Sequence, residues 1–143
     1  MAGNIIIIHF AGATWDEISP WLDLRATRRR DRMWNYPEND YTLRLYDYPD
    51  ICTEYEPGDL ESLRTLLGGM PSLSLCLELR RSRGNPACDR AEELILSLLS
   101  AFSGVVDDNW VTDHYWVLGE LESGNSKSHG RFLDCYRTQI SDA

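Results

Sequence analysis

Residues 72–104 read SLSLCLELRRSRGNPACDRAEELILSLLSAFSG, and their pattern decides the fold. Leucine occupies every second position over residues 73–79, with mostly polar residues between, which is the period of a β-strand with one apolar face. Asn85 then offers a helix N-cap and Pro86 a first helical position. Apolar residues follow at helical spacing as far as Gly104, which we expect to close the helix in a left-handed conformation. The stretch therefore predicts a strand followed by a long amphipathic helix.

Similar patterns along the rest of the chain predict an α+β fold. They indicate strands at residues 4–10, 41–48 and 115–122 and helices at residues 14–24 and 58–67. Other segments are expected to be loop or short extended chain, namely residues 34–40, 51–56 and 123–130, with a closing helix or strand at 132–140. We expect one domain, residues 1–143, built as a two-layer sandwich. Its mainly antiparallel sheet has four to five strands, with two or three helices on one face.

Composition indicates where the protein works. The chain has 143 residues, of which 43% are hydrophobic, so it is long enough to bury a core. No apolar run approaches the roughly 20 residues that span a bilayer, and residues 5–8 lack the basic leader of a signal peptide. We therefore expect a cytoplasmic protein without a membrane partner, whose four cysteines are reduced thiols.

The net charge of −9 is unevenly distributed. An acidic surface repels nucleic acid and anionic lipid and favours cationic partners. Five arginines between positions 25 and 32 are the exception, and Trp21 and Trp34 flank them. The arginines would bind phosphate or RNA, with the tryptophans stacking on bases, or would neutralise acidic groups within the fold or between two copies. The acidic surroundings favour neutralisation.

Residues 47–61 form the most unusual segment, because they contain six carboxylates and no lysine or arginine. Tyrosines are interleaved with these acids, a combination that suits the capture of a basic protein surface. A solvated strand end and helix start is the alternative interpretation, in which Asp59 and Glu61 favour the helix dipole. The residues that we expect to contact a partner are Asp47, Tyr48, Asp50, Glu54, Tyr55 and Glu56.

Catalytic and metal-binding patterns find little support. The acids of residues 47–61 do not have the spacing of a calcium loop, and no zinc, phosphate-loop or serine-hydrolase motif is present. His9 lies in an apolar strand and is expected to be a hydrogen-bonded structural residue. Cys135, His114 and Asp113 could form a nucleophilic arrangement only if the fold brought them together. We therefore expect no catalytic residues, no cofactor and no metal.

One resemblance bears on function. The stretch SLSLCLELRRS…ACDRAEELILSLLSAFSGVVDDNW…YWVLGEL resembles small bacterial proteins that are encoded beside secreted toxins and regarded as immunity proteins. The resemblance covers about half the chain and implies a cytosolic protein that blocks a toxin by binding it. It contains no shared site motif, so no residue role is carried over.

These observations favour a non-enzymatic binding protein, an immunity-type inhibitor of a cationic toxin or effector domain. A structural or oligomeric domain is the alternative, for example a homodimer joined through exposed aromatic residues such as Trp34 and Tyr46. A small hydrolase that uses His114 or Cys135 is a third interpretation.

Overall fold

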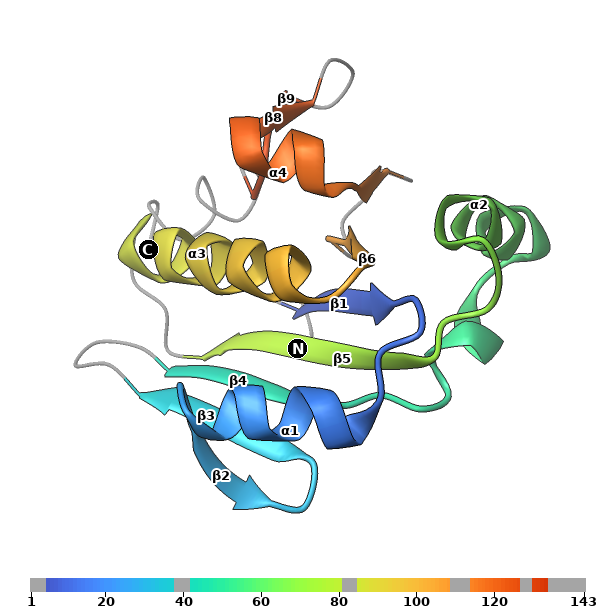
Figure 1. The fold of residues 1–143 in the computed structure, drawn as a ribbon. Helices are drawn as coiled ribbons and strands as arrows, with labels where there is room; N and C mark the ends of the chain where they lie inside the picture. Colours follow the sequence, from blue (N-terminus) through green and yellow to red (C-terminus); the bar gives the residue numbers. More distant parts are fainter. Residues whose placement is uncertain (1–4, 38–41, 81–84, 109–113, 127–129, 134–143) are drawn as a thin grey trace.

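The protein is described by a computed structural model that covers residues 5–37, 42–80, 85–108, 114–126 and 130–133. Figure 1 shows strands side by side in one twisted sheet, with α1 and α3 packed against it. The elements in chain order are β1 (Ile5–Phe10), α1 (Trp15–Asp23), β2 (Thr27–Arg30), β3 (Met33–Pro37), β4 (Thr42–Asp47), η1 (Ile51–Glu54), α2 (Pro57–Leu67), β5 (Leu73–Arg80), α3 (Asn85–Ala101), β6 (Gly104–Asp107), β7 (Tyr115–Trp116), α4 (Leu118–Ser123), β8 (Asn125–Ser126) and β9 (Gly130–Arg131).

The main sheet has seven strands in the order β2-β3-β4-β5-β1-β6-β7. Every neighbouring pair is antiparallel, and β8 and β9 form a separate pair. The predicted α+β fold with an antiparallel sheet is thus confirmed, although the sheet is wider than the four to five strands expected. β1 lies between β5 and β6 and is buried from residue 6 to residue 10, as its apolar run predicts.

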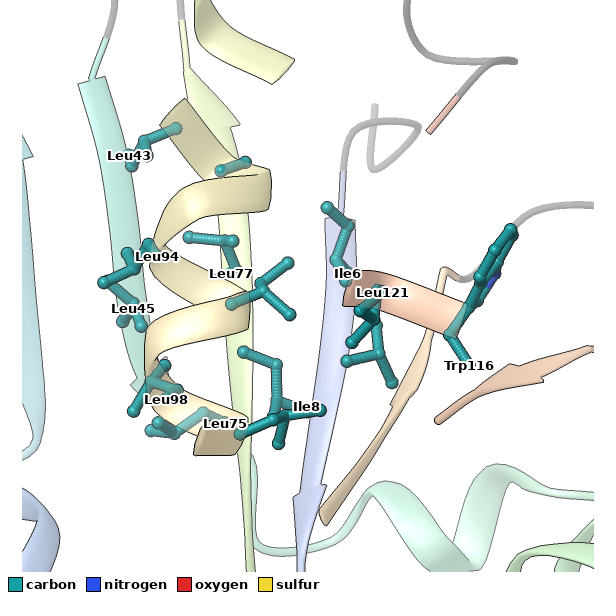
Figure 2. Packing of buried hydrophobic residues seen from close by; sticks show 14 of the residues in the cluster. Ile6, Ile8, Leu43, Leu45, Leu75, Leu77, Leu94, Leu98, Trp116 and Leu121 are labelled. Carbon is teal, nitrogen blue, oxygen red and sulfur yellow. The ribbon is translucent and has the colours of Figure 1, made fainter. Parts of the chain in front are cut away.

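One face of the sheet carries the main core. Leu45, Leu77 and Ile6 stand opposite one another on β4, β5 and β1, so they share this face. Figure 2 shows Leu94 and Leu98 of α3 lying over it. Buried residues of α1 and α4 belong to the same core, so three helices share one face, as expected. We call this the helical face.

The other face of the sheet is partly covered by α2. Tyr46, Cys76 and Ile7 stand opposite one another on this face, one residue out of phase with the helical core. Leu63 of α2 packs there with Val105 of β6 in a second, smaller cluster. The helix between β4 and β5 therefore extends the architecture beyond the two expected layers. We call this the opposite face.

The segment around the arginines is a hairpin. Residues 34–40 were expected to be a loop because of their asparagines and proline, but β3 occupies Met33–Pro37 and pairs with both β2 and β4. Trp34 is fully buried and stacks on Trp15 at 6.1 Å between ring centroids. Tertiary packing of this indole outweighs the local preference of asparagine and proline for turns. The helix α1 ends at Asp23, before the first of the arginines.

Two further expectations about local structure are wrong. Ile51–Glu54 forms a short 3₁₀ helix rather than extended chain. The strand expected at residues 115–122 is limited to Tyr115–Trp116, and α4 follows it. The Glu120 carboxylate accepts the Val117 backbone N–H at 3.2 Å, which satisfies a donor at the helix start. Most of residues 132–140 lies outside the described part of the chain.

Gly104 does not close α3, which ends at Ala101. Gly104 begins β6 instead, and a Cβ at this position would lie 2.3 Å from the His9 carbonyl oxygen. Glycine is required here by the close approach of β1 rather than by a left-handed conformation. Within the described ranges, no helix combines the length and apolar character needed to cross a membrane.

Candidate partner-binding surface

The acidic segment leaves the sheet at the end of β4 and runs through η1 into α2 (Figure 1). The Tyr48 backbone N–H donates to the Ser74 carbonyl at 3.0 Å and continues the pairing with β5 past the end of the strand. α2 begins after Glu56 and ends at Gly68, whose positive φ of 78° suits the absence of a side chain. Asp47 is the last residue of β4, and the other five expected contact residues lie on a short connection held at both ends by regular structure.

Tyr55 is turned into the protein. Its hydroxyl lies 2.6 Å from Asp107 Oδ2 and 2.7 Å from His9 Nε2. The other His9 nitrogen, Nδ1, lies 2.7 Å from Ser74 Oγ, and both His9 and Ser74 are buried. The ring of Tyr55 also meets Tyr115 edge to face at 6.2 Å. Tyr55 thus joins the segment to β1, β5 and β6 instead of being displayed to a partner.

The direction of each bond in this chain follows from the chemistry. A carboxylate only accepts, so the Tyr55 hydroxyl donates its proton to Asp107. His9 Nε2 must then carry the hydrogen donated to Tyr55, and Nδ1 accepts from the Ser74 hydroxyl. Burial lowers the pKa of His9 to about 4, and burial next to Asp107 raises the pKa of Tyr55. Both residues are therefore neutral near pH 7, which agrees with the structural role expected for His9.

Asp47 is paired with one of the protein's own arginines. Arg32 Nη1 lies 3.4 Å from Asp47 Oδ2, and the guanidinium stands 4.7 Å above the Trp15 ring. In the same hairpin, Arg28 forms a 2.6 Å ion pair with Asp23. These two arginines show the neutralisation within the fold that the sequence favours.

The remaining acids face solvent. Asp50, Glu54 and Glu56 are exposed, and the partly exposed Tyr48 donates from its hydroxyl to Glu54 Oε2 at 2.8 Å. Among the described residues, no ion pair involves any of these three carboxylates. We call Tyr48, Asp50, Glu54 and Glu56 the acidic surface.

The nucleophilic arrangement considered above has only one described member. His114 Nε2 lies 2.9 Å from Glu120 Oε1, and its ring packs edge to face on Trp116 at 5.0 Å. Cys135 and Asp113 lie outside the described residues. The three described cysteines, Cys52, Cys76 and Cys88, are free thiols. Within the described residues, no group of three or more potential metal ligands comes together.

A second acidic feature escaped sequence reasoning. A cavity of about 460 Å³ lies between α3 and α4, with Leu96 and Leu121 as its apolar lining. Its polar lining consists of Asp89, Glu92, Glu93, Glu122, Ser123 and Arg131. The spacing of the first three acids on α3 was visible as a polar helix face, but α4 was expected to be a strand, so the hollow between two helices could not be foreseen.

Comparison with known proteins gives no family or relative from which a function could be inferred, so the inference rests on the physical features described above. No protein family, curated protein or solved structure matches the chain.

Proposed function

We propose that this protein is a non-enzymatic binding protein that captures a basic protein surface, as an immunity-type inhibitor of a cationic toxin or effector domain does. The observation that carries the proposal is the exposure of Asp50, Glu54 and Glu56 without an ion-pair partner in the described part of the chain. A cytoplasmic location is part of the proposal.

The acidic surface is held in a fixed position by the fold, and this supports the proposed function. Partly buried hydrogen bonds from Tyr55 fix the segment just before Glu56, so its backbone loses little freedom when a partner binds. The net charge of −9 adds long-range attraction toward a cationic partner. In this proposal Tyr55 positions the surface, Asp47 lies at its edge in an internal ion pair, and Tyr48 supplies the aromatic contact.

The test is to capture a partner by pull-down with this protein as bait, and then to measure association rates with the purified partner. Reversing Glu54 and Glu56 to lysine should slow association at least tenfold at low salt, and the effect should shrink as salt screens the charges. An Asp16→Lys/Asp31→Lys variant makes the same change in net charge elsewhere and should have a smaller effect. Equal rates for the wild type and the Glu54/Glu56 variant would reject the proposal.

A homodimer joined through the opposite face is the second candidate. Tyr46 and Met33 stand opposite each other on β4 and β3, and both remain partly exposed. Trp34, which was expected to be exposed, is buried in the core and cannot join two copies. Sedimentation at several concentrations distinguishes the homodimer from the monomeric binding protein. A dimer that forms in the wild type and is lost in the Tyr46→Asp variant would favour the homodimer.

A further inference from the structure

A small cavity lies where α1, β3 and α3 meet, away from the acidic surface. Its volume is about 160 Å³, and its lining residues are Arg25, Tyr36, Arg90, Glu93, Leu94 and Ser97. The four residues from α3 have the i, i+3, i+4, i+7 spacing of one helix face. Arg25 follows α1, and Tyr36 comes from β3. Three segments far apart in the sequence thus converge on one hollow.

Tyr36 and Glu93 both help to hold Arg90 in place. Its Nη2 donates to the Tyr36 hydroxyl, and its guanidinium lies 4.5 Å from the centre of the Tyr36 ring. Its Nη1 donates to Glu93 Oε2 at 3.3 Å. Because the Tyr36 oxygen accepts from Arg90, the hydroxyl proton of Tyr36 remains able to donate to a bound group.

Arg25 is fixed although it is exposed. Its Nη1 donates to the Trp21 carbonyl at 2.9 Å, and its guanidinium lies 3.7 Å above the Trp21 ring. In the described ranges, no carboxylate pairs with it. The side chain therefore loses little conformational entropy when its remaining N–H groups bind a ligand.

The cavity has the charge and size for one phosphate group. Among the described lining residues, two guanidinium groups face one carboxylate, that of Glu93, within an acidic protein. A volume of 160 Å³ equals that of about five water molecules, which accommodates a tetrahedral oxyanion. Guanidinium forks and hydroxyl donors match phosphate oxygens, and the fixed Arg25 and Arg90 supply them without a large rearrangement.

We propose that this cavity binds a phosphate group, either as the free ion or as a phosphomonoester on another molecule. Arg25 and Arg90 bind the oxygens, and the Tyr36 and Ser97 hydroxyls add donors. Glu93 holds Arg90 in place and opposes the anion electrostatically. The proposal does not depend on capture of a basic protein at the acidic surface.

The test is an NMR titration of the full chain with inorganic phosphate, and separately with O-phosphoserine, at constant ionic strength in a phosphate-free buffer. Saturable shifts at the backbone amides of Tyr36, Arg90 and Ser97 are expected. Stronger binding of O-phosphoserine identifies a phosphomonoester, and stronger binding of inorganic phosphate identifies the free ion. Shifts that never saturate, or equal binding of acetate, would overturn the proposal.

Three variants sharpen the test. Arg25→Gln should weaken phosphate binding about tenfold, the loss expected for one charged hydrogen-bond donor. Glu93→Gln should strengthen binding, because it removes the opposing charge. Arg29→Gln removes an exposed arginine that does not line the cavity and should leave the affinity unchanged. An equal loss in Arg25→Gln and Arg29→Gln would mean that general charge, not this cavity, attracts the anion.

Discussion

The acidic surface and the hairpin that carries the arginines have opposite charges and are built in opposite ways. In the hairpin region, guanidinium groups lie over the protein's own tryptophans, with Arg28 at 5.2 Å from Trp34 and Arg32 at 4.7 Å from Trp15. On the acidic surface, tyrosine contributes a single hydroxyl, and the carboxylates otherwise face water. Arg28 and Arg32 thus stabilise the fold, whereas the acids remain available to another molecule.

Asp23 shows how charges at the hairpin are satisfied within the fold. It accepts from Arg28 and from the indole N–H of Trp34, at 2.9 and 2.8 Å to the same oxygen. Those two hydrogen bonds, with Arg28 the larger influence, lower the pKa of Asp23. Comparison of the two regions teaches that charge alone does not identify a binding surface, because the partners already present within the fold decide whether that charge remains available.

The largest expected effect comes from the centre of the hairpin region. Trp34→Ala should lower the free energy of unfolding by about 3–5 kcal/mol, because it empties a fully buried site and removes the indole donor to Asp23. Urea unfolding measures the change. Leu24→Ala is the matched control, since Leu24 is 84% exposed and should cost little. Equal costs would contradict the conclusion that the buried Trp34 indole stabilises the hairpin region.

The next effect concerns the network that anchors the acidic segment. In the folded protein the pKa of His9 is about 4, against 6.5 when it is exposed, so the unfolded state binds the proton first as pH falls. Stability should decline from about pH 6.5 down to pH 4, by about 3 kcal/mol for this group. His9→Gln should show a shallower decline over this window in urea unfolding. If the free energy of unfolding fell equally with pH in both proteins, His9 would not be the cause of the decline.

A smaller effect is expected from one hydroxyl of the same network. Tyr55→Phe leaves the aromatic packing but removes the donor to Asp107 and the acceptor for His9. Loss of these two hydrogen bonds, one of them to the buried His9 ring, should lower the free energy of unfolding by about 1–3 kcal/mol. Amide hydrogen exchange in η1 should also become faster. Tyr48→Phe, which loses only an exposed bond to Glu54, is the control, and an equal cost in both variants would argue against an anchoring role.

The smallest effect on stability is expected on the acidic surface itself. Glu54→Lys/Glu56→Lys should change the free energy of unfolding by no more than about 0.5 kcal/mol, since both side chains are exposed. Thermal unfolding measures it. A loss comparable with that of Trp34→Ala would show that these acids stabilise the fold and are not reserved for a partner.

Sequence periodicity correctly predicted the elements in which the burial of side chains follows one regular pattern along the whole element. β5 and α3 repeat leucine at their own periods, and β1 is apolar throughout, so each pattern reports burial directly. The β2–β3 hairpin was missed because its arginines, Asn35 and Pro37 suit exposed or irregular chain. Trp34 is held as a strand residue by Trp15 and β4, which lie elsewhere in the sequence.

The candidate site was only partly accessible to sequence reasoning. The acidic segment was visible from composition, but the inward turn of Tyr55 depends on His9 and Asp107, 46 and 52 residues away. One signal was present: a histidine in a buried strand needs a partner for each ring nitrogen. Nothing in the local sequence says which tyrosine provides it.

The position of β1 inside the sheet has a consequence for folding. Its isoleucines pair with β5, where Ile5 stands opposite Glu78, and with β6, where Ile7 stands opposite Asp107. During synthesis this strongly apolar strand therefore stays unpaired on at least one edge until both β5 and β6 have been synthesised. Such long-range pairing slows folding and lengthens the time in which the strand can associate with other chains.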